Sequence, residues 1–250
     1  DVEFSMIEGK TEITGEDHLI KNTDIIKAMK IATHNKMDEN REIVSLEPTS
    51  FLLNDSVVVK NPVRQEAESL TVKALLVTIP RKNVYTMVKC LEKIGVEVAD
   101  FTLGTIGDYA ANETSLMKTN VGAIINIGYQ TSTVSIFNKG LLTNTSRLEV
   151  GSYNVLYDLA YIYKISKKDA NLVKNELAAA HKRGTSASVH KDFTSKDGKT
   201  VTISEYEASE IASSRLEEIL KLAKKEINLL TKKEIHYIMI TGGVSEMPQF

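Results

Sequence analysis

The stretch Ala123-Ile-Ile-Asn-Ile-Gly-Tyr-Gln-Thr-Ser-Thr-Val-Ser-Ile-Phe-Asn138 joins two apolar segments through a polar turn that contains a glycine. Residues 121–126 and 133–138 have the apolar, β-branched character of strands. A Lys-Gly pair then leads into a third such segment at residues 141–150, and short turns between apolar runs are typical of hairpins. The region therefore predicts a β-meander.

The turn after the first of these strands has the residue types of a phosphate-binding loop. Gly128 is followed by three hydroxyl side chains, and such a turn can direct several backbone amides and hydroxyl groups at one anion. Asn126, at the end of the strand, is placed to hold a metal-bound water. An ordinary hairpin loop is the alternative interpretation, and the turn alone does not decide between the two.

A second glycine turn lies in Ile238-Met-Ile-Thr-Gly-Gly-Val-Ser-Glu-Met-Pro248. A strand predicted over residues 235–240 enters the pair Gly242-Gly243. Two residues without Cβ allow a ligand to approach the backbone closely. Taken alone, this turn is also consistent with an ordinary connection.

Between the two turns, the sequence predicts helices with recognisable starts. The segment Val150-Gly-Ser152 leads into the first helix. Ser-x-x-Asp and Ser-x-x-Glu patterns, beginning at Ser166 and Ser204, have the spacing of capping boxes, and the second helix is predicted to run to about Leu230. Residues 182–200 are rich in Ser, Lys, Asp and Gly, which predicts an exposed loop or a weak hairpin.

The first 120 residues predict a mixed α/β region. The spacing of apolar residues predicts helices at residues 24–34, 83–94 and 108–116. Gly95 is placed to end the second helix in a left-handed conformation. Apolar runs bounded by turn residues predict strands at residues 42–46, 51–53, 57–59, 69–79 and 96–103, with a polar connection at residues 35–41.

Composition and charge exclude several classes of protein. The 250 residues include 31 basic and 33 acidic side chains, and a net charge of −2 leaves no basic field for nucleic acid. Uninterrupted apolar stretches fall far short of the ~20 residues that cross a bilayer. The single thiol, Cys90, cannot form an intrachain disulfide, which favours a cytoplasmic location. Cys90 itself is predicted to be semi-buried on a packed helix.

Sequence motifs of common catalytic sites are absent. Gly9-Lys-Thr11 and Gly198-Lys-Thr200 lack the glycine that a P-loop carries five residues earlier, where this chain has Phe4 and Phe193, so both are predicted to be polar turns. The five histidines form no i, i+4 pair of the zinc-hydrolase kind, and no Gly-x-Ser-x-Gly elbow is present. The sequence thus predicts no catalytic residue and no metal-ligating cluster.

The order of these pieces resembles the second half of the actin-like ATPase fold, an α/β fold related to ribonuclease H, and within it the FtsA family of bacterial cell-division proteins. Asn126-Ile-Gly128, with Thr131 and Thr133, is similar to the family's Asp-Ile-Gly-Gly-Gly-Thr phosphate loop. Further segments are similar to the family's other motifs and to its 1C helix: Leu148-Glu-Val-Gly151, Asp158-Leu-Ala160, Asp169-Ala170 with Lys174, Ala212-Ser-Ser-Arg-Leu-Glu-Glu-Ile219, Ile240-Thr-Gly-Gly-Val244 with Met247-Pro248, and Val84 to Gly95.

This resemblance implies a nucleotide site and a subdomain organisation. The implied cofactors are ATP and Mg²⁺, and the implied site residues are Asn126, Gly128, Tyr129, Gln130, Thr131, Gly151, Lys174, Gly242 and Gly243. The implied subdomains are 1C-like at residues 1–97, a return through 1A at 98–119, 2A-like and nucleotide-binding at 120–165 and 235–250, and 2B-like at 166–234.

Departures from the family motif bear on catalysis. The family's Asp is Asn126 here and its next two glycines are Tyr129 and Gln130, although some members show Asn-x-Gly-Tyr. Because Asn lacks the negative charge that Asp offers to Mg²⁺ or to an attacking water, we predict weak or no ATP hydrolysis by this chain. The family's first phosphate loop and its C-terminal membrane-binding helix are expected outside this chain, which would then be an interior segment of a longer protein.

The resemblance implies that the protein is an adaptor at the division site, on the cytoplasmic face of the cell membrane. The whole protein is expected to hold the C-terminal tail of FtsZ on 2B and to self-associate into filaments through 1C and 2B. Arg215 is our candidate to pair with the acidic tail, since a guanidinium can hold a carboxylate in two parallel bonds. A surface pair with Glu217 or Glu218 is the alternative.

Three other functions share the superfamily. A PilM-like pilus assembly protein has a similar arrangement, but the Arg-Leu-Glu-Glu segment starting at Arg215 favours FtsA. A phosphotransferase would need a catalytic Asp in a substrate cleft, for which no motif is found. A chaperone would need a substrate-binding domain after the Gly242-Gly243 turn.

Overall fold

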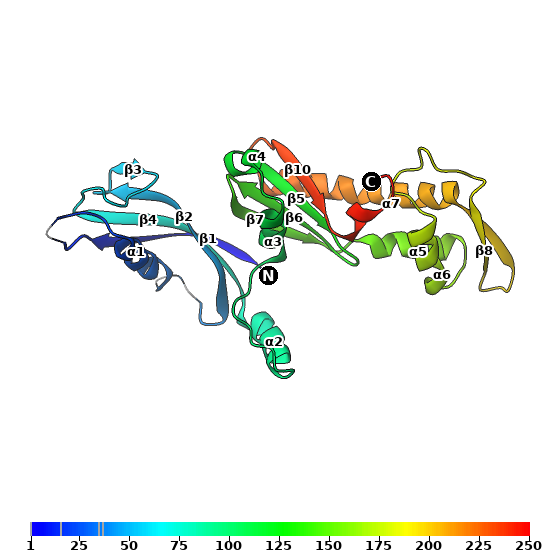
Figure 1. The fold of residues 1–250 in the computed structure, drawn as a ribbon, viewed down its shortest axis with the longest axis horizontal. Helices are drawn as coiled ribbons and strands as arrows, with labels where there is room; N and C mark the ends of the chain where they lie inside the picture. The colour runs from blue at the N-terminus through cyan, green and yellow to red at the C-terminus, as the bar shows by residue number, and fades with distance from the viewer. Residues whose placement is uncertain (1, 16, 35, 37) are drawn as a thin grey trace. The chain divides into compact units, whose positions relative to one another are not determined.

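The computed structural model describes residues 2–15, 17–34, 36 and 38–250, so part of the connection predicted at residues 35–41 lies outside the described residues. The chain divides into two compact units. The N-terminal unit is Asp1–Gly104 and the C-terminal unit is Thr105–Phe250. Each unit is built around its own four-stranded sheet, shown in Figure 1.

The sheet of the N-terminal unit is antiparallel and has the strand order β1-β4-β2-β3. Its elements are β1 (Glu3–Glu12), α1 (Asn22–His34), β2 (Arg41–Leu53), β3 (Val57–Val59) and β4 (Ser69–Pro80). Helix α1 covers one face of the sheet, and β4, the most apolar strand, is buried along most of its length. This confirms the strand predicted at residues 69–79 and the helix predicted at 24–34.

Gly9 lies in a strand, so the polar turn predicted for Gly9-Lys-Thr11 was wrong. It pairs with Val72 in the ladder between β1 and β4. A Cβ at Gly9 would lie 2.0 Å from the carbonyl oxygen of Ala28 and 2.7 Å from the amide nitrogen of Ala32. Glycine is therefore required because the backbone of α1 crosses β1 at this point.

Residues 41–53 form the single strand β2, whereas the sequence predicted two strands separated at Pro48. The register between β2 and β4 shifts between Pro48 and Ser50. Strand β3 pairs with residues 51–53, and within the described part of the chain no strand faces Pro48 on that side. A proline fits a strand at such a bulged, one-sided position because its missing N–H interrupts no ladder.

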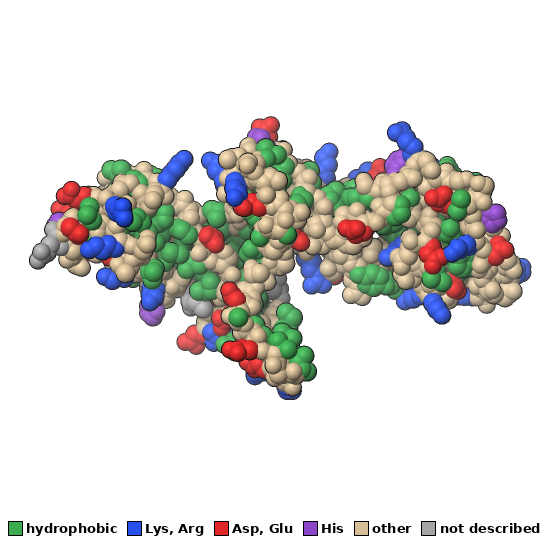
Figure 2. Space-filling model, in the orientation of Figure 1, with side chains coloured by type: hydrophobic (Ala, Val, Ile, Leu, Met, Phe, Trp, Pro, Cys, Tyr) green, Lys and Arg blue, Asp and Glu red, His purple; other side chains and the backbone are tan. Residues whose placement is uncertain are grey.

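Helix α2 (Arg81–Glu92) matches the prediction, and Gly95 ends it with φ 79°, as expected. The strand predicted at residues 96–103 was wrong, because this segment pairs with no strand among the described residues. Residues 98–101 instead line a small pocket with Val84 and Val88. Cys90 is exposed rather than semi-buried. Only Val84 of the apolar stripe is buried, and Figure 2 shows hydrophobic side chains at the surface of α2.

The sheet of the C-terminal unit has the order β10-β5-β6-β7. Strands β5 (Val121–Ile127), β6 (Ser132–Asn138) and β7 (Leu141–Leu148) form the predicted antiparallel meander. Strand β10 (Tyr237–Thr241) returns from far along the chain and lies parallel to β5.

Helices cover both faces of this sheet. The odd-numbered residues of β5 pack into one core with α5 (Ser152–Ile162), α6 (Lys167–Glu176) and α7 (Glu205–Leu230). On the other face, Tyr109 of α3 (Gly104–Ala111) stacks on Phe137 of β6 with ring centroids 4.6 Å apart. The single helix predicted at 108–116 is interrupted, because Thr114 caps the separate helix α4 (Ser115–Thr119).

Both predicted serine caps are present, and the one at Ser204 is a complete capping box, whereas Ser166 forms only the half in which its side chain caps the helix. Ser166 Oγ accepts the N–H of Asp169 at 3.1 Å, and Ser204 and Glu207 exchange side-chain to backbone bonds at 3.2 and 3.3 Å. The weak hairpin of the exposed region consists of β8 (His190–Thr194) and β9 (Thr200–Ser204), with Gly198 in its turn as predicted. A single turn of 3₁₀ helix, η1 (Gly243–Glu246), follows β10.

Among the described helices, none is both long enough and apolar enough to cross a bilayer.

Replacing Gly9 with alanine should push α1 away from β1 and lower the free energy of unfolding by about 1–3 kcal/mol, as overpacking does elsewhere. Gly107→Ala is the matched control, because a Cβ there meets no atom within 4 Å and alanine is the better helix former, by about 1 kcal/mol at most. Urea denaturation followed by circular dichroism measures both. An equal loss of stability in the two variants would contradict the conclusion that the backbone of α1 crosses β1 closely at Gly9.

Candidate functional site

The two glycine turns meet at one edge of the C-terminal sheet. Strands β5 and β10 run parallel, with Asn126 opposite Thr241 in the register. The loop that begins at Gly128 and the pair Gly242-Gly243 therefore follow directly from neighbouring strand ends. In open α/β sheets, ligands bind outside the carboxyl ends of the strands.

The second turn requires a glycine at its first position. Gly242 has φ 93°, and a Cβ there would lie 2.5 Å from the carbonyl oxygen of Ile127 and 2.7 Å from Asn126 Oδ1. Gly243 differs, because a Cβ there would meet no atom within 4 Å. The backbone at Gly243 is therefore open to a ligand.

The first turn is fastened to the start of α5 by two backbone hydrogen bonds. Ser152 N–H donates to the carbonyl oxygen of Gly128 at 2.9 Å, and Tyr153 N–H donates to that of Tyr129 at 2.7 Å. A Cβ at Gly151 would lie 2.6 and 2.7 Å from the same two oxygens. Gly151 thus allows the contact, and amides that a helix start leaves unpaired are satisfied by the loop.

The loop also presents amides of its own. Gly128 N–H donates to the carbonyl oxygen of Thr131 at 3.0 Å and closes the turn. In the described part of the chain, the N–H groups of Tyr129, Gln130 and Thr131 have no acceptor on the protein. Ser132, by contrast, is buried and donates its hydroxyl to Val150. The loop therefore offers consecutive amides, but not the Ser132 hydroxyl, to an anion.

The two turns border one pocket of about 410 Å³, which we call the glycine-turn pocket. This volume lies within the ordinary range for small-ligand sites. Its lining residues are Gly128, Tyr129, Ser152, Lys174, Asn175, Gly243, Val244, Glu246, Met247 and Pro248.

The structure places fewer than half of the predicted nucleotide residues in the lining of this pocket and others in the turns beside it. Four of them line it: Gly128, Tyr129, Lys174 and Gly243. Asn126, Gly151 and Gly242 support its two turns, while Gln130 and Thr131 belong to the loop without lining the pocket. The sequence did not indicate two further lining residues. Asn175 directly follows the predicted Lys174, and Glu246 lies within the glycine-turn segment at residues 238–248.

Lys174 supplies a cation to the pocket. Its Nζ lies 5.9 Å from the centroid of the Tyr129 ring, and burial lowers the pKa of its ammonium group. Within the described residues, no carboxylate forms an ion pair with it. An unpaired amine, free loop amides and an open backbone at Gly243 together suit an anionic ligand such as a nucleotide.

The Mg²⁺ implied by the resemblance would have oxygen ligands near the strand ends. The described residues contain no group of three His, Cys, Asp or Glu side chains that could hold a metal alone. Nucleotide-bound Mg²⁺ needs fewer, since it uses one or two carboxylates beside phosphate oxygens and waters. Asn126 Nδ2 donates to Asp108 Oδ2 at 2.8 Å, so a carboxylate that the sequence did not indicate lies beside the predicted residue. The available groups therefore fit ATP with Mg²⁺.

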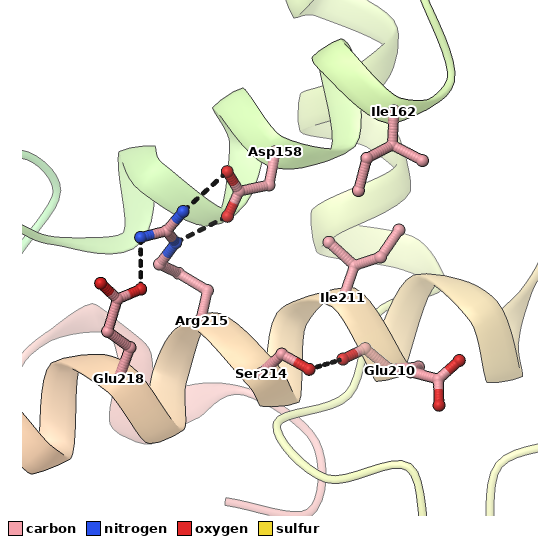
Figure 3. A pocket seen from close by; sticks show the side chains of 7 residues that line it. All are labelled: Asp158, Ile162, Glu210, Ile211, Ser214, Arg215 and Glu218. Carbon is pink, nitrogen blue, oxygen red and sulfur yellow. Dashed lines mark hydrogen bonds and ion pairs between the residues drawn. The ribbon is translucent and has the colours of Figure 1, made fainter.

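Arg215 lies elsewhere in the C-terminal unit, in a groove between α5 and α7 (Figure 3). Its guanidinium holds both oxygens of Asp158, at 2.6 and 2.9 Å, and one oxygen of Glu218 at 2.5 Å. The bond to Asp158 is the main reason that the pKa of Arg215 is raised. The alternative pair with Glu218 is therefore present, and Asp158 is a second partner that the sequence did not indicate.

The topology, with a meander, a parallel return strand and two glycine turns around one pocket, defines a protein of the actin-like ATPase fold. A solved structure of MreB5 from Spiroplasma citri bound to ADP has a TM-score of 0.59 at 15% identity and covers 69% of this chain and 56% of its own. A PilM–PilN type IV pilus biogenesis complex has a TM-score of 0.55 at 12% identity, covering 98% of this chain and 60% of its own.

The chain belongs to the FtsA family of cell division proteins. A family model described as "Cell division protein FtsA" matches residues 123–247, and one described as "SHS2 domain inserted in FTSA" matches residues 2–78. The chain is similar to FtsA of Bacillus subtilis (25% identity over 245 residues, 96% of this chain) and of Enterococcus hirae (25% over 254 residues, 99%). It spans only 55% and 56% of those relatives.

Replacing Gly151 with alanine should separate the loop from α5, because the new Cβ would meet both loop carbonyls. Hydrogen exchange at Ser152 and Tyr153 should accelerate by about tenfold or more, the equivalent of roughly 1.4 kcal/mol of lost local stability. Gly243→Ala is the control, since its Cβ meets nothing within 4 Å. Unchanged exchange in Gly151→Ala would show that the two hydrogen bonds do not hold the loop.

Proposed function

We propose that the complete protein is a cell-division adaptor that binds ATP with Mg²⁺ in the glycine-turn pocket and recruits FtsZ through the groove at Arg215. The observation that carries the recruitment is this groove, which combines a fixed guanidinium with apolar side chains on a chain of the FtsA family. Its volume is about 280 Å³, which suits a few side chains of a peptide rather than a folded domain.

Arg215 has one carboxylate partner that fixes its position and a second partner that another carboxylate can replace. Asp158, whose side chain is only 21% exposed, fixes the guanidinium in two parallel bonds. Glu218 is 56% exposed and belongs to a surface pair, a class worth about 0–1 kcal/mol. A carboxylate of the FtsZ tail can therefore replace Glu218 at little cost while Asp158 keeps Arg215 oriented.

The rest of the groove suits apolar tail residues. Ile162 of α5 and Ile211 of α7 face each other across it in Figure 3. Tyr157 and Tyr161 lie exposed on the same helix as Ile162, and their rings stack 6.5 Å apart. Because Glu210 and Glu218 also border the groove, we expect the tail to contribute one well-placed carboxylate together with apolar side chains.

Self-association and membrane attachment complete the proposed role. Filaments would form between the 1C-like and 2B-like subdomains, and the protein would act on the cytoplasmic face of the membrane at the division site. Family membership supports this part of the proposal. Attachment would use a C-terminal helix expected outside this chain.

The substitution Arg215→Glu should lower the affinity for an FtsZ-tail peptide by about tenfold or more, because it removes the cation and adds a third carboxylate beside Asp158 and Glu218. Fluorescence anisotropy with a labelled peptide measures this. Glu218→Gln should keep or raise the affinity, since it removes the competing charge.

Lys221→Glu is the matched control, because it makes the same charge change on the exposed side of the same helix. It should leave tail binding within about twofold of the unaltered protein. An unchanged affinity in Arg215→Glu, with thermal melting showing a folded protein, would refute the groove as the FtsZ site. Preference for a pilus-protein peptide over the FtsZ tail would favour the PilM-like role.

The substitution Lys174→Met should weaken ATP binding by the complete protein about tenfold or more, the worth of a charge-assisted hydrogen bond. Folding should be unaffected, because Lys174 forms no ion pair in the described structure. Isothermal titration calorimetry with ATP and Mg²⁺ measures the affinity. Lys168→Met, on the exposed side of the same helix, is the control, and equal weakening in both variants would contradict a specific role for Lys174.

A further inference from the structure

The fold places Asp108 beside Asn126, at the carboxyl end of β5, although the two residues are distant in the sequence. Asp108 lies on α3, 18 residues before Asn126, and its Oδ2 accepts the Nδ2 hydrogen of Asn126 at 2.8 Å. Asn126 ends β5 next to Gly242, so this bond turns Asn126 Oδ1 away from Asp108 and towards the second glycine turn. The orientation of the Asn126 amide is thereby set by Asp108.

The Asp108 carboxylate is half-buried and has only this uncharged partner. Within the described residues, no Lys, Arg or His forms an ion pair with it, and its Oδ1 accepts no hydrogen bond from the protein. Removing a carboxylate from water is unfavourable unless a cation or several donors compensate. A cation bound at this place would supply the missing compensation.

A second polar group on the same helix also has no partner. Thr105 is only 8% exposed, and its hydroxyl forms no hydrogen bond within the described structure. Thr105 precedes Asp108 by three residues, so both side chains project from one face of α3. Buried hydroxyl groups without a protein partner are commonly satisfied by an ordered water.

We propose that Asp108 is a positioning residue for the hydrated Mg²⁺ of bound ATP, acting together with the Asn126 amide. Its free oxygen would accept a hydrogen bond from a metal-bound water, and the Asn126 oxygen would face the phosphates. This inference rests on the proposed binding of ATP. It supplies the negative charge that Asn126 cannot, from a helix on the opposite face of the sheet from α5 and α7.

The test compares ATP affinity with Mg²⁺ and with EDTA, measured by calorimetry on the complete protein. Mg²⁺ should tighten ATP binding by about tenfold or more in the unaltered protein, and Asp108→Asn should reduce this advantage to about twofold or less. Affinity in EDTA should be the same or slightly better in the variant, because a carboxylate near the phosphates is repulsive without the metal. Asp192→Asn is the control, since that carboxylate also accepts from an uncharged side chain, that of Thr202.

Exchanging the two side chains gives a stricter test. Asp108→Asn combined with Asn126→Asp moves the charge to the other end of the same hydrogen bond and should restore the Mg²⁺ advantage. If Asp108 had only a structural role, moving the negative charge to residue 126 would not restore the effect of Mg²⁺ on ATP affinity. Restored stability without restored metal dependence would overturn the proposal.

Labelling of carboxylates with carbodiimide and glycine ethyl ester, followed by mass spectrometry, needs no substitution and so remains decisive where Asp108→Asn fails to fold. ATP with Mg²⁺ should protect Asp108, and ATP in EDTA should not. Equal protection in both buffers, or an unchanged Mg²⁺ advantage in a folded Asp108→Asn variant, would overturn the role of Asp108 while ATP binding stands. Failure of the unaltered protein to bind ATP in either buffer would overturn the proposed function and this role with it.

Discussion

Two backbone hydrogen bonds, from the first amides of α5 to the carbonyl oxygens of Gly128 and Tyr129, hold the loop after β5 in the position on which the candidate site depends. They form because Gly151 has no Cβ, which would otherwise meet both oxygens at under 3 Å. By fixing the loop against α5, they hold Gly128 and Tyr129 in the wall of the pocket that Gly243 also lines. The absence of a Cβ at Gly151 therefore allows the meander to contact the helix that follows it.

Local signals in the sequence predicted the features that depend on neighbouring residues. The meander, the capping serines Ser166 and Ser204 and the left-handed Gly95 all follow from residues within one turn of each other. The order of these pieces then indicated the resemblance to a family, and the resemblance implied a role for the two glycine turns that local signals left open. The strand predicted at residues 96–103 shows where local patterns fail. An apolar segment forms a strand only where the edge of a sheet is available for pairing, and the local sequence does not reveal this.

Features that depend on distant segments could not be predicted in this way. Gly9 looked like a turn because the helix that crosses it is separated from it by more than a dozen residues. Nothing in the sequence indicated that Asp108 or Asp158 would pair with a side chain on another element. Their partners, Asn126 and Arg215, lie 18 and 57 residues further along the chain, and only the packing of α3 and α5 makes these pairs.

Helix α5 begins at the pocket, and Asp158 lies in the groove roughly 1.7 turns later at 3.6 residues per turn. At 1.5 Å per residue, the two ends of this connection lie about 9 Å apart along a single rigid element. Helix α5 is thus a short, rigid connection between the glycine-turn pocket and the groove at Arg215. If a ligand in the pocket changes the affinity of the groove for its own ligand through α5, then a ligand in the groove must change the affinity of the pocket by the same factor.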